Sequence, residues 1–193
     1  HMTDLLELIK TRRTVKPAAM NGTILDDSAI LKCLEAAHWA PTHGRTEPWR
    51  FFVYSGEALA RFCTDHAEMY RSAAGPENFM VSKYDSLKNM SHTVSHLVVV
   101  GMQRTPMTKI PFLEEYAAVS AAVQNILLMA HSLGIAAIWS TGGMALKPEM
   151  KAYLGLQQQE DEVVGFIYLG KTDKEDIPAT RKTPVADKIH WTK

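Results

Sequence analysis

The segment that most limits how this chain can fold is FLEEYAAVSAAVQNILLMAHSL, residues 112–133. Its spacing predicts a helix with alanine and leucine on nearly every face. A helix that is apolar all round has to be enclosed by other parts of the protein. We therefore predict a central helix here, ended by Gly134 as a C-terminal cap.

Four short apolar runs, rich in aromatic or β-branched residues, predict strands between the helices. Their sequences are WRFFVYSG, SHLVVVGM, IAAIW and VVGFIYLG (49–56, 95–102, 135–139 and 163–170). Because long helices separate the strands, we expect an α+β or α/β sandwich rather than a helical bundle.

Further helices are predicted on both sides of the first strand. The first is expected at residues 3–11 and the third at 57–72. The second begins at a capping residue, Asp26 or Asp27, and ends before Pro41. The second of these carries an apolar stripe of Ile30, Leu31, Leu34 and Ala37. Residues 75–92 fit either another helix or a mobile flap.

The length and the charge balance of the chain favour a single globular domain without a nucleic-acid or membrane partner. With 193 residues and a 46% hydrophobic share, we expect one domain over residues 2–193, and we interpret His1 as a remnant of an expression tag. Lys plus Arg equals Asp plus Glu at 21 each, which gives no support to a nucleic-acid or anionic-membrane partner. No apolar run approaches the roughly 20 residues that span a bilayer.

The two cysteines indicate a reducing compartment. Cys33 and Cys63 form no C-x-x-C pair, so we expect buried thiols and a cytoplasmic protein. His92 and His96 are four apart and could share a metal on one helix face, but no glutamate stands beside the first, and we expect a surface pair and no metal.

Several common catalytic motifs are absent. No two of the 11 glycines are two apart, which excludes the G-x-G-x-x-G dinucleotide fingerprint. The chain also lacks a G-x-x-x-x-G-K-[ST] loop and a G-x-S-x-G elbow. Histidines 38, 66 and 131 lie in predicted helices, where we expect satisfied or exposed side chains.

Two basic groups suit an anionic ligand. Arg12, Arg13, Thr14 and Lys16 follow the first predicted helix, and the pair 181–182 (Arg-Lys) lies near the C-terminus. Guanidinium groups bind phosphate oxygens bidentately, so the set fits a phosphate monoester. Taken alone, the arginine pair is better explained as solvated charge at a helix C-terminus.

Two loops add features of a site for a flat ligand. IWSTGG, residues 138–143, ends a predicted strand with hydroxyls and two glycines whose backbone a ligand can approach closely, although an ordinary turn has the same composition. APTHGRTEPWRFFV, residues 40–53, gathers polar residues on a loop before a strand. There Pro41 to Gly44, with the His43 ring, could lie against an aromatic surface.

Together these pieces resemble the nitroreductase family of flavin mononucleotide (FMN) oxidoreductases. LLELIKTRRTVK is similar to the family's opening RRSxR motif, and AAHWAPTHGRTEPWRFFV to its A-P-S-x-x-N-x-Q-P-W-x-F motif. The family's mid-chain flavin loop is matched by GIAAIWSTGG, and its final part by VVGFIYLG followed by RKTPVADKIHW. The resemblance thus covers almost all of residues 4–191. The loop with His43 is most similar to that of the compact YdjA-like branch of the family, in which the corresponding loop also has a histidine.

The resemblance implies a fold and an assembly. The expected fold is an α+β, nitroreductase-like α/β/α sandwich, with a mostly antiparallel central sheet surrounded by helices. It also implies a homodimer with FMN at the interface and a C-terminal arm on the partner. The residues alone leave open whether the tail with Ile189 and Trp191 packs on a partner or on its own domain.

The resemblance also implies the contacts of the flavin. Arg12, Arg13 and Thr14 would hold the phosphate and ribityl chain with Arg181 or Lys182, and Lys16 would lie near the pyrimidine edge and tune the ring. The expected contacts from the other subunit and from the mid-chain loop are Trp39, Pro41, Thr42, His43, Trp139, Ser140, Thr141 and Gly142.

The implied activity is a ping-pong reaction in which NADH or NADPH passes a hydride to flavin N5 and an acceptor such as a nitroaromatic or quinone is then reduced. No side chain is expected to act as catalytic acid or nucleophile. The alternatives are a flavin-dependent dehalogenase-like enzyme and a flavin-binding redox partner with little turnover. The physiological acceptor and the choice of nicotinamide stay open.

Overall fold

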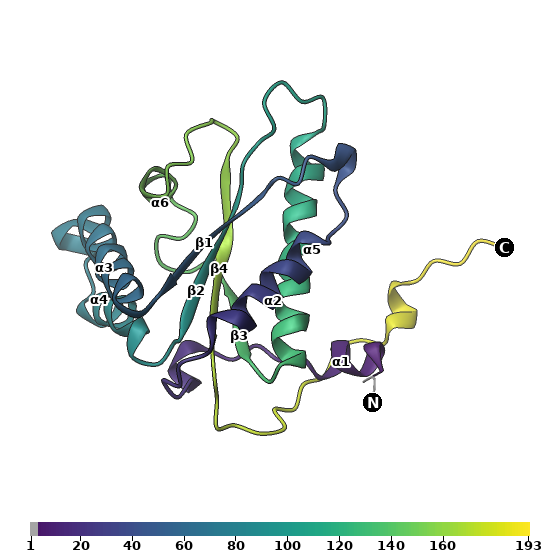
Figure 1. Ribbon diagram of the computed structural model, residues 1–193, viewed down its shortest axis with the longest axis horizontal. Coiled ribbons are helices and arrows are strands. Elements are labelled where there is room, and N and C mark those ends of the chain that lie inside the picture. Colours follow the sequence, from purple (N-terminus) through teal and green to yellow (C-terminus); the bar gives the residue numbers. More distant parts are fainter. Residues whose placement is uncertain (1–3) are drawn as a thin grey trace.

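The computed structural model describes residues 4–193 and has three layers, with a sheet between two groups of helices (Figure 1). Four short 3₁₀ turns, η1 to η4, interrupt the connections in the described chain. The main elements are α1 (Leu5–Thr11), α2 (Asp27–His38), β1 (Trp49–Ser55), α3 (Gly56–Asn78), α4 (Val81–Lys88), β2 (His96–Met102), α5 (Phe112–Ser132), β3 (Ala136–Ser140), α6 (Pro148–Tyr153) and β4 (Glu162–Gly170).

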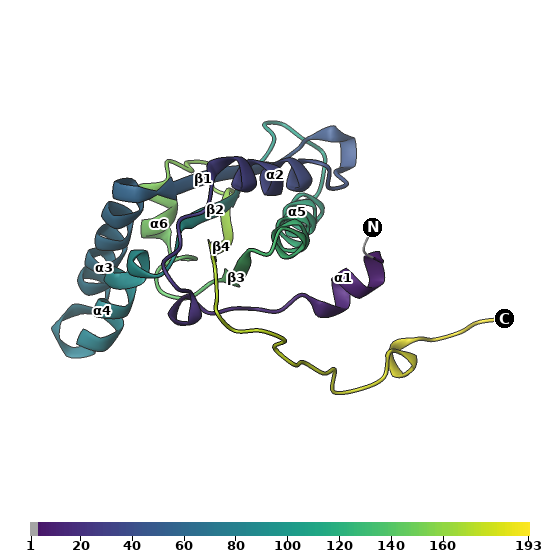
Figure 2. The ribbon, with the colours of Figure 1, turned by 60° about the horizontal axis from the view of Figure 1, so that its bottom comes forward.

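The sheet has the strand order β1-β2-β4-β3, and every neighbouring pair is antiparallel. Its two faces bury different side chains because successive residues of a strand point to opposite sides. In β2, Val98 and Val100 pack with α2 and α5, while Leu97 and Val99 pack with α3 and α4. Helices α2 and α5 cover one face, and α3, α4 and α6 lie across the other (Figures 1 and 2). The predicted α+β sandwich with a central antiparallel sheet is confirmed.

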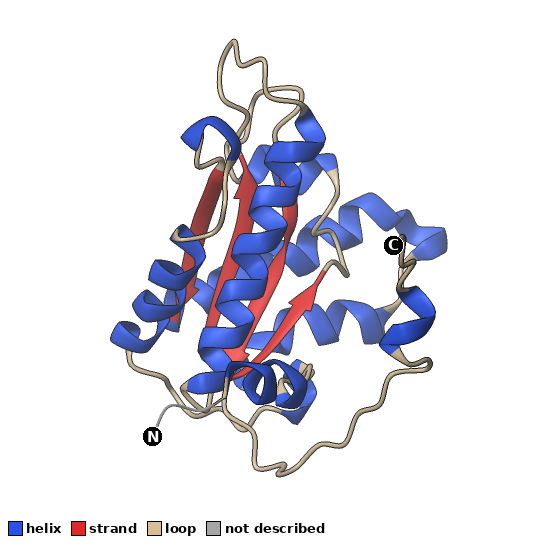
Figure 3. Cartoon of the chain, turned by 90° about the vertical axis from the view of Figure 1, so that its right-hand side faces the viewer, coloured by secondary structure: helices blue, strands red, loops and turns tan. Residues whose placement is uncertain are grey.

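Helix α5 runs along the length of the sheet and is the central helix that its composition predicted (Figure 3). Its side chains at Val119, Ala122, Val123 and Ile126 are completely buried. Gly134 follows it with a φ of 70°, a left-handed conformation that glycine adopts without a side-chain clash.

Several helical details differ from the sequence-based expectation. In α2, Asp26 is the N-cap and accepts a hydrogen bond from Ser28 N at 2.8 Å, but Leu31 is exposed and Cys33 takes the buried position. Helix α3 extends past residue 72 through a kink at Gly75, where φ is 70°. The 75–92 region contains the helix α4, and the short helix α6 was not anticipated.

The expected surface pair of histidines is wrong. His92 is exposed at the end of η3, whereas His96 begins β2 and is buried. The His96 ring lies between Ser95 Oγ and Asp27 Oδ1, each 2.8 Å from one of its nitrogens. In residues 4–193 no three metal-ligating side chains form a cluster, and no helix is long and apolar enough to cross a membrane. Both cysteines are buried, unpaired thiols as predicted.

After β4 the chain leaves the body of the molecule and runs past α1 (Figures 1 and 2). All residues from 178 to 193 are exposed, including Ile189 and Trp191, the latter with 78% of its surface accessible. The tail, residues 178–193, is therefore not packed on its own domain in this structure.

Candidate functional site

The segment that follows α1 is attached to the sheet and positions the basic residues. Thr14 forms a parallel bridge with Ala137 of β3, and Val15 N donates a hydrogen bond to Ala137 O at 3.0 Å. Val15 is buried against the core, which fixes the segment. As a result Arg12 and Arg13 lie where β3 begins and α5 ends.

A cavity of about 480 Å³ opens at this place. Polar and charged side chains line one part of it, and apolar side chains, among them Leu127 of α5 and Ala136 and Ala137 of β3, line the rest. The polar and charged lining residues are Thr11, Arg12, Arg13, His131, Thr172, Lys174 and Asp176. A volume of this size suits a cofactor-sized ligand.

The two arginines differ in what holds them. Arg13 donates from Nε to Ile177 O and from Nη1 to Lys10 O, both at 2.7 Å, so carbonyls fix its orientation. Burial lowers the pKa of Arg12, and the like charges of Arg181 and Arg13 lower it further. Among residues 4–193, neither Arg12 nor Arg13 forms an ion pair with a carboxylate. The lining has three cations, Arg12, Arg13 and Lys174, against one carboxylate, Asp176, and this excess of positive charge makes a binding place for an anion.

His131 joins this group from the last turn of α5. Its Nε2 lies 2.9 Å from Thr11 Oγ1, and its ring lines the cavity. Burial lowers its pKa, and the charges of Arg12 and Arg13 add to that effect. Sequence reasoning missed this residue because 120 positions separate it from Thr11, and only its place at the end of the central helix was visible.

The mid-chain loop after β3 has an ordered backbone. Trp139 Nε1 donates to Val164 O at 3.2 Å, and Ser140 Oγ accepts from Gly142 N at 3.3 Å. Gly143 has a φ of 61°, and Met144 N donates to His66 Nε2 at 2.9 Å. Thr141 and Gly142 are exposed, so a ligand can reach their backbone.

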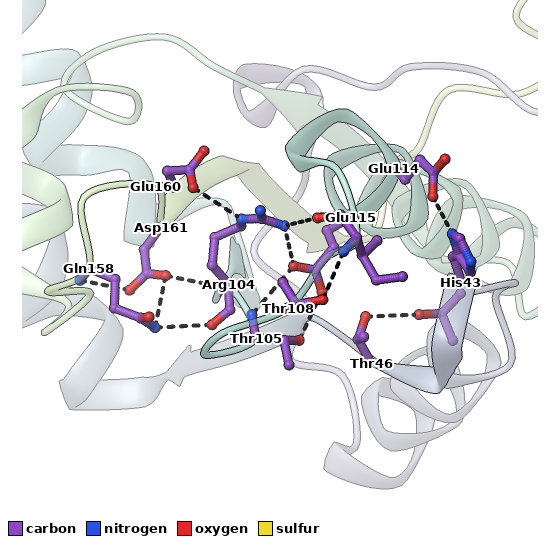
Figure 4. Close-up of polar contacts among 12 residues, drawn as sticks. His43, Thr46, Arg104, Thr105, Thr108, Glu114, Glu115, Gln158, Glu160 and Asp161 are labelled. Atoms are coloured by element: carbon purple, nitrogen blue, oxygen red, sulfur yellow. Dashed lines mark hydrogen bonds and ion pairs between the residues drawn. The ribbon is translucent and has the colours of Figure 1, made fainter.

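The other predicted loop, residues 41–47, is held at the opposite end of α5 by a polar network (Figure 4). Its His43 pairs with Glu114 in the first turn of α5, and Thr42 Oγ1 accepts from Glu47 N at 3.1 Å. Trp39, Pro41 and His43 are exposed.

The centre of that network is the buried Glu115, which is 1% exposed. Arg104 Nη1 lies 2.5 Å from its Oε1, and Thr105 Oγ1 donates to its Oε2 at 2.9 Å. Burial raises the pKa of Glu115, but hydrogen bonds from Thr46, Thr105 and Arg104 outweigh burial and leave the pKa below its ordinary value. The 41–47 loop is thus tied to α5 through Thr46.

One chain does not bring all the predicted site residues together. The α5 residues that contact the two groups, Glu114 and His131, are about 25 Å apart at roughly 1.5 Å per helical residue. Thr14 and Lys16 are exposed beside the arginines but do not line the cavity. Arg181 and Lys182 lie in the extended tail, where Arg181 is near enough to Arg12 to affect its pKa.

Comparison of the sequence with known proteins identifies the family of this chain. The sequence model of the nitroreductase family matches residues 9–171. YdjA of Escherichia coli strain K12, named as a candidate NAD(P)H nitroreductase, is 29% identical over 167 residues, which cover 86% of this chain and 87% of YdjA.

Solved structures agree with the sequence match. A nitroreductase-like family protein from Bacillus cereus superposes with a TM-score of 0.85 at 26% identity, covering 100% of this chain and 97% of that one. A nitroreductase from Bacteroides fragilis, solved with bound FMN, has a TM-score of 0.69 at 25% identity, with both chains covered completely at 100%.

Proposed function

Because the chain belongs to the nitroreductase family, we propose that it is an FMN-dependent oxidoreductase that takes electrons from NADH or NADPH and reduces nitroaromatic, quinone or similar electron-poor acceptors. The observation that carries this proposal is the pair of Arg12 and Arg13 in the lining of a cavity, with Arg181 close enough to Arg12 to lower its pKa. Within the described chain neither Arg12 nor Arg13 is paired with a carboxylate.

The donor set fits the phosphate of FMN. Among residues 4–193 the Arg12 guanidinium has no hydrogen-bond or ion-pair partner and is available for phosphate oxygens, while Arg13 is already oriented by three carbonyls and adds a positive field. Thr14 supplies a hydroxyl beside them, and Arg181 or Lys182 would complete the group from the tail. A dianionic phosphate relieves the repulsion among these cations, which favours binding.

Other residues would contact the rest of the cofactor. Trp139, Ser140, Thr141 and Gly142 offer an indole, two hydroxyls and an exposed backbone to the ring and the ribityl chain. Lys16 would stand near the pyrimidine edge, where a fixed positive charge stabilises the negative charge of reduced flavin. When bound, the flavin supplies the redox chemistry, accepting a hydride from the nicotinamide and returning electrons to the acceptor in a ping-pong sequence.

The distance along α5 supports a homodimer. The exposed loop with Trp39, Pro41, Thr42 and His43 is too far from the arginines of its own chain to contact the same FMN molecule, so we propose that this loop serves the site of the partner subunit. Two exposed apolar surfaces also favour a second copy of the chain, which would cover them. One surface lies on α1 and the other on the tail, and their residues are Leu5, Leu6 and Ile9, and Val185, Ile189 and Trp191.

The direct test is anaerobic. Purified protein reconstituted with FMN is mixed with NADH or with NADPH, and the flavin absorbance is followed. Rapid bleaching, and its reversal by a nitroaromatic or quinone, is the expected result. Colour without bleaching would instead indicate a flavin-binding redox partner, and bleaching coupled to halide release from a haloaromatic would indicate the dehalogenase-like activity.

The phosphate assignment has its own test. The double variant Arg12→Ala with Arg13→Ala should lose FMN affinity by about a hundredfold or more, because each charged contact contributes roughly 1.5–3 kcal/mol. The control is Arg61→Ala with Arg71→Ala, which removes the same two positive charges from exposed positions of α3 and should bind FMN normally. Full FMN content in the double variant would refute the assignment.

A further inference from the structure

We propose that His66 is a positioning residue: its imidazole holds the glycine loop, residues 141–145, in the shape that presents Thr141 and Gly142 to the ligand. The inference rests on the proposed function, in which this loop faces FMN. His66 itself touches neither the loop's outer surface nor the cavity of the arginines, and would act through the loop.

The first evidence is one hydrogen bond in a buried setting. His66 is 2% exposed, and its Nε2 accepts from Met144 N at 2.9 Å. An imidazole nitrogen can accept only when it carries no proton, so this contact requires the tautomer with hydrogen on Nδ1. Loss of the acceptor would leave a buried backbone N–H without a partner, which is costly.

The second evidence is the fit between the ring and Gly143. A Cβ at this glycine would lie 2.6 Å from His66 Nε2, 2.8 Å from its Cε1 and 3.0 Å from Leu87 Cδ2. The backbone has a φ of 61° at this position, which residues with a side chain rarely adopt. Glycine is needed here for two separate reasons, and one of them is the presence of the imidazole.

The third evidence is that the ring has little freedom to move. The His66 centroid is 5.5 Å from that of Phe166 in a T-shaped contact and 6.0 Å from that of Phe62. Phe166 belongs to β4 and pairs with Ser140, the last residue of β3. The histidine therefore packs on β4, the strand that is paired with β3, from which the loop departs.

These contacts divide the loop into an anchored half and a presented half. Met144 and Ala145 are buried, and Ala145 N closes a turn by donating to Gly142 O at 3.2 Å. Thr141 and Gly142 precede that turn and are exposed. Because one turn joins the two halves, a displacement of Met144 would move the backbone that a ligand contacts.

The experiment compares His66→Phe, which keeps a ring but has no acceptor, with His66→Gln, whose amide oxygen can accept. Hydrogen exchange at Met144 N–H is measured in cofactor-free protein, and FMN affinity and the midpoint potential of bound FMN are measured in reconstituted protein. His66→Phe should speed the exchange and weaken FMN about tenfold, and His66→Gln should restore most of both. The midpoint potential should shift in His66→Phe and return towards the wild-type value in His66→Gln.

Controls separate positioning from general stability. Phe62→Leu loosens the same aromatic group but keeps the acceptor, so it should lower the melting temperature and leave Met144 exchange and FMN affinity near wild type. If His66→Phe does not fold, Gly143→Ala displaces the loop from the other side and should reproduce the loss of affinity.

Wild-type protection of Met144 N–H and wild-type FMN affinity in His66→Phe would overturn the inference, as would wild-type affinity in Gly143→Ala where His66→Phe does not fold. If wild-type protein binds no FMN, the proposed function fails, while the exchange measurement still decides whether His66 anchors the loop.

Discussion

Acidification should destabilise this protein through His66 in a defined pH range. Burial lowers the pKa of the His66 side chain from 6.5 to about 4. Between these two values the unfolded chain binds a proton at this residue and the folded chain does not. The stabilisation is therefore complete above about pH 6.5 and is lost as the pH falls towards 4.

The size of the effect follows from the separation of the two pKa values. At about 1.4 kcal/mol per pKa unit, the difference corresponds to roughly 3 kcal/mol of unfolding free energy lost over the whole range. That is a large part of the total stability expected for a domain, which is roughly 5–15 kcal/mol. The steepest change should fall between about pH 4.5 and 6, where the slope approaches 1.4 kcal/mol per pH unit.

The assay is urea unfolding of cofactor-free protein at half-unit steps from pH 4 to 7.5, for wild type and His66→Phe. Other titrating groups are shared, so the difference between the two stabilities isolates this histidine. The wild type should be the more stable protein at pH 7 by a margin that shrinks as the pH falls. Parallel stability curves for the two proteins would refute the reasoning.

Three further predictions concern other parts of the molecule. Arg104→Met should cost about 3–5 kcal/mol of stability by urea unfolding, because it leaves the buried Glu115 without its cation, and a cost below 1 kcal/mol would contradict that role. His43→Ala should change the KM and kcat for acceptors with little change in melting temperature, since the exposed ring packs on no core, and unchanged kinetics would remove it from the site. Deleting residues 178–193 should convert dimer to monomer in sedimentation and lower FMN content, and a truncated dimer with full FMN would show that the arm is dispensable.

Much of the fold was accessible from local patterns. The all-apolar composition of 112–133 predicted the central helix, and the β-branched runs predicted the four strands within a residue or two. Errors arose where tertiary packing decided the outcome. Leu31 is exposed although it matches the stripe, because Cys33 lies on the side of α2 that meets α5. His96 is buried because a strand begins there and Ser95 and Asp27 satisfy the ring.

The candidate site was predictable only in part. Motif resemblance selected the arginines and both loops, since their residue types carry recognisable chemistry. His131 and His66 were not selected, because each is brought to its loop or cavity by a contact between distant segments, 120 and 78 positions apart in sequence. No local pattern distinguishes such a histidine from an ordinary helical one.

The placement of the arginines and the His43 loop at opposite ends of α5 has a genetic consequence in the proposed dimer. Each binding site would draw its cations from one polypeptide and its histidine loop from the other. A protomer defective in the arginines, co-expressed with a protomer defective in the loop, would form mixed dimers with one intact site and one doubly defective site. Two inactive alleles would then complement each other, and each mixed dimer would have up to half the activity of a wild-type dimer.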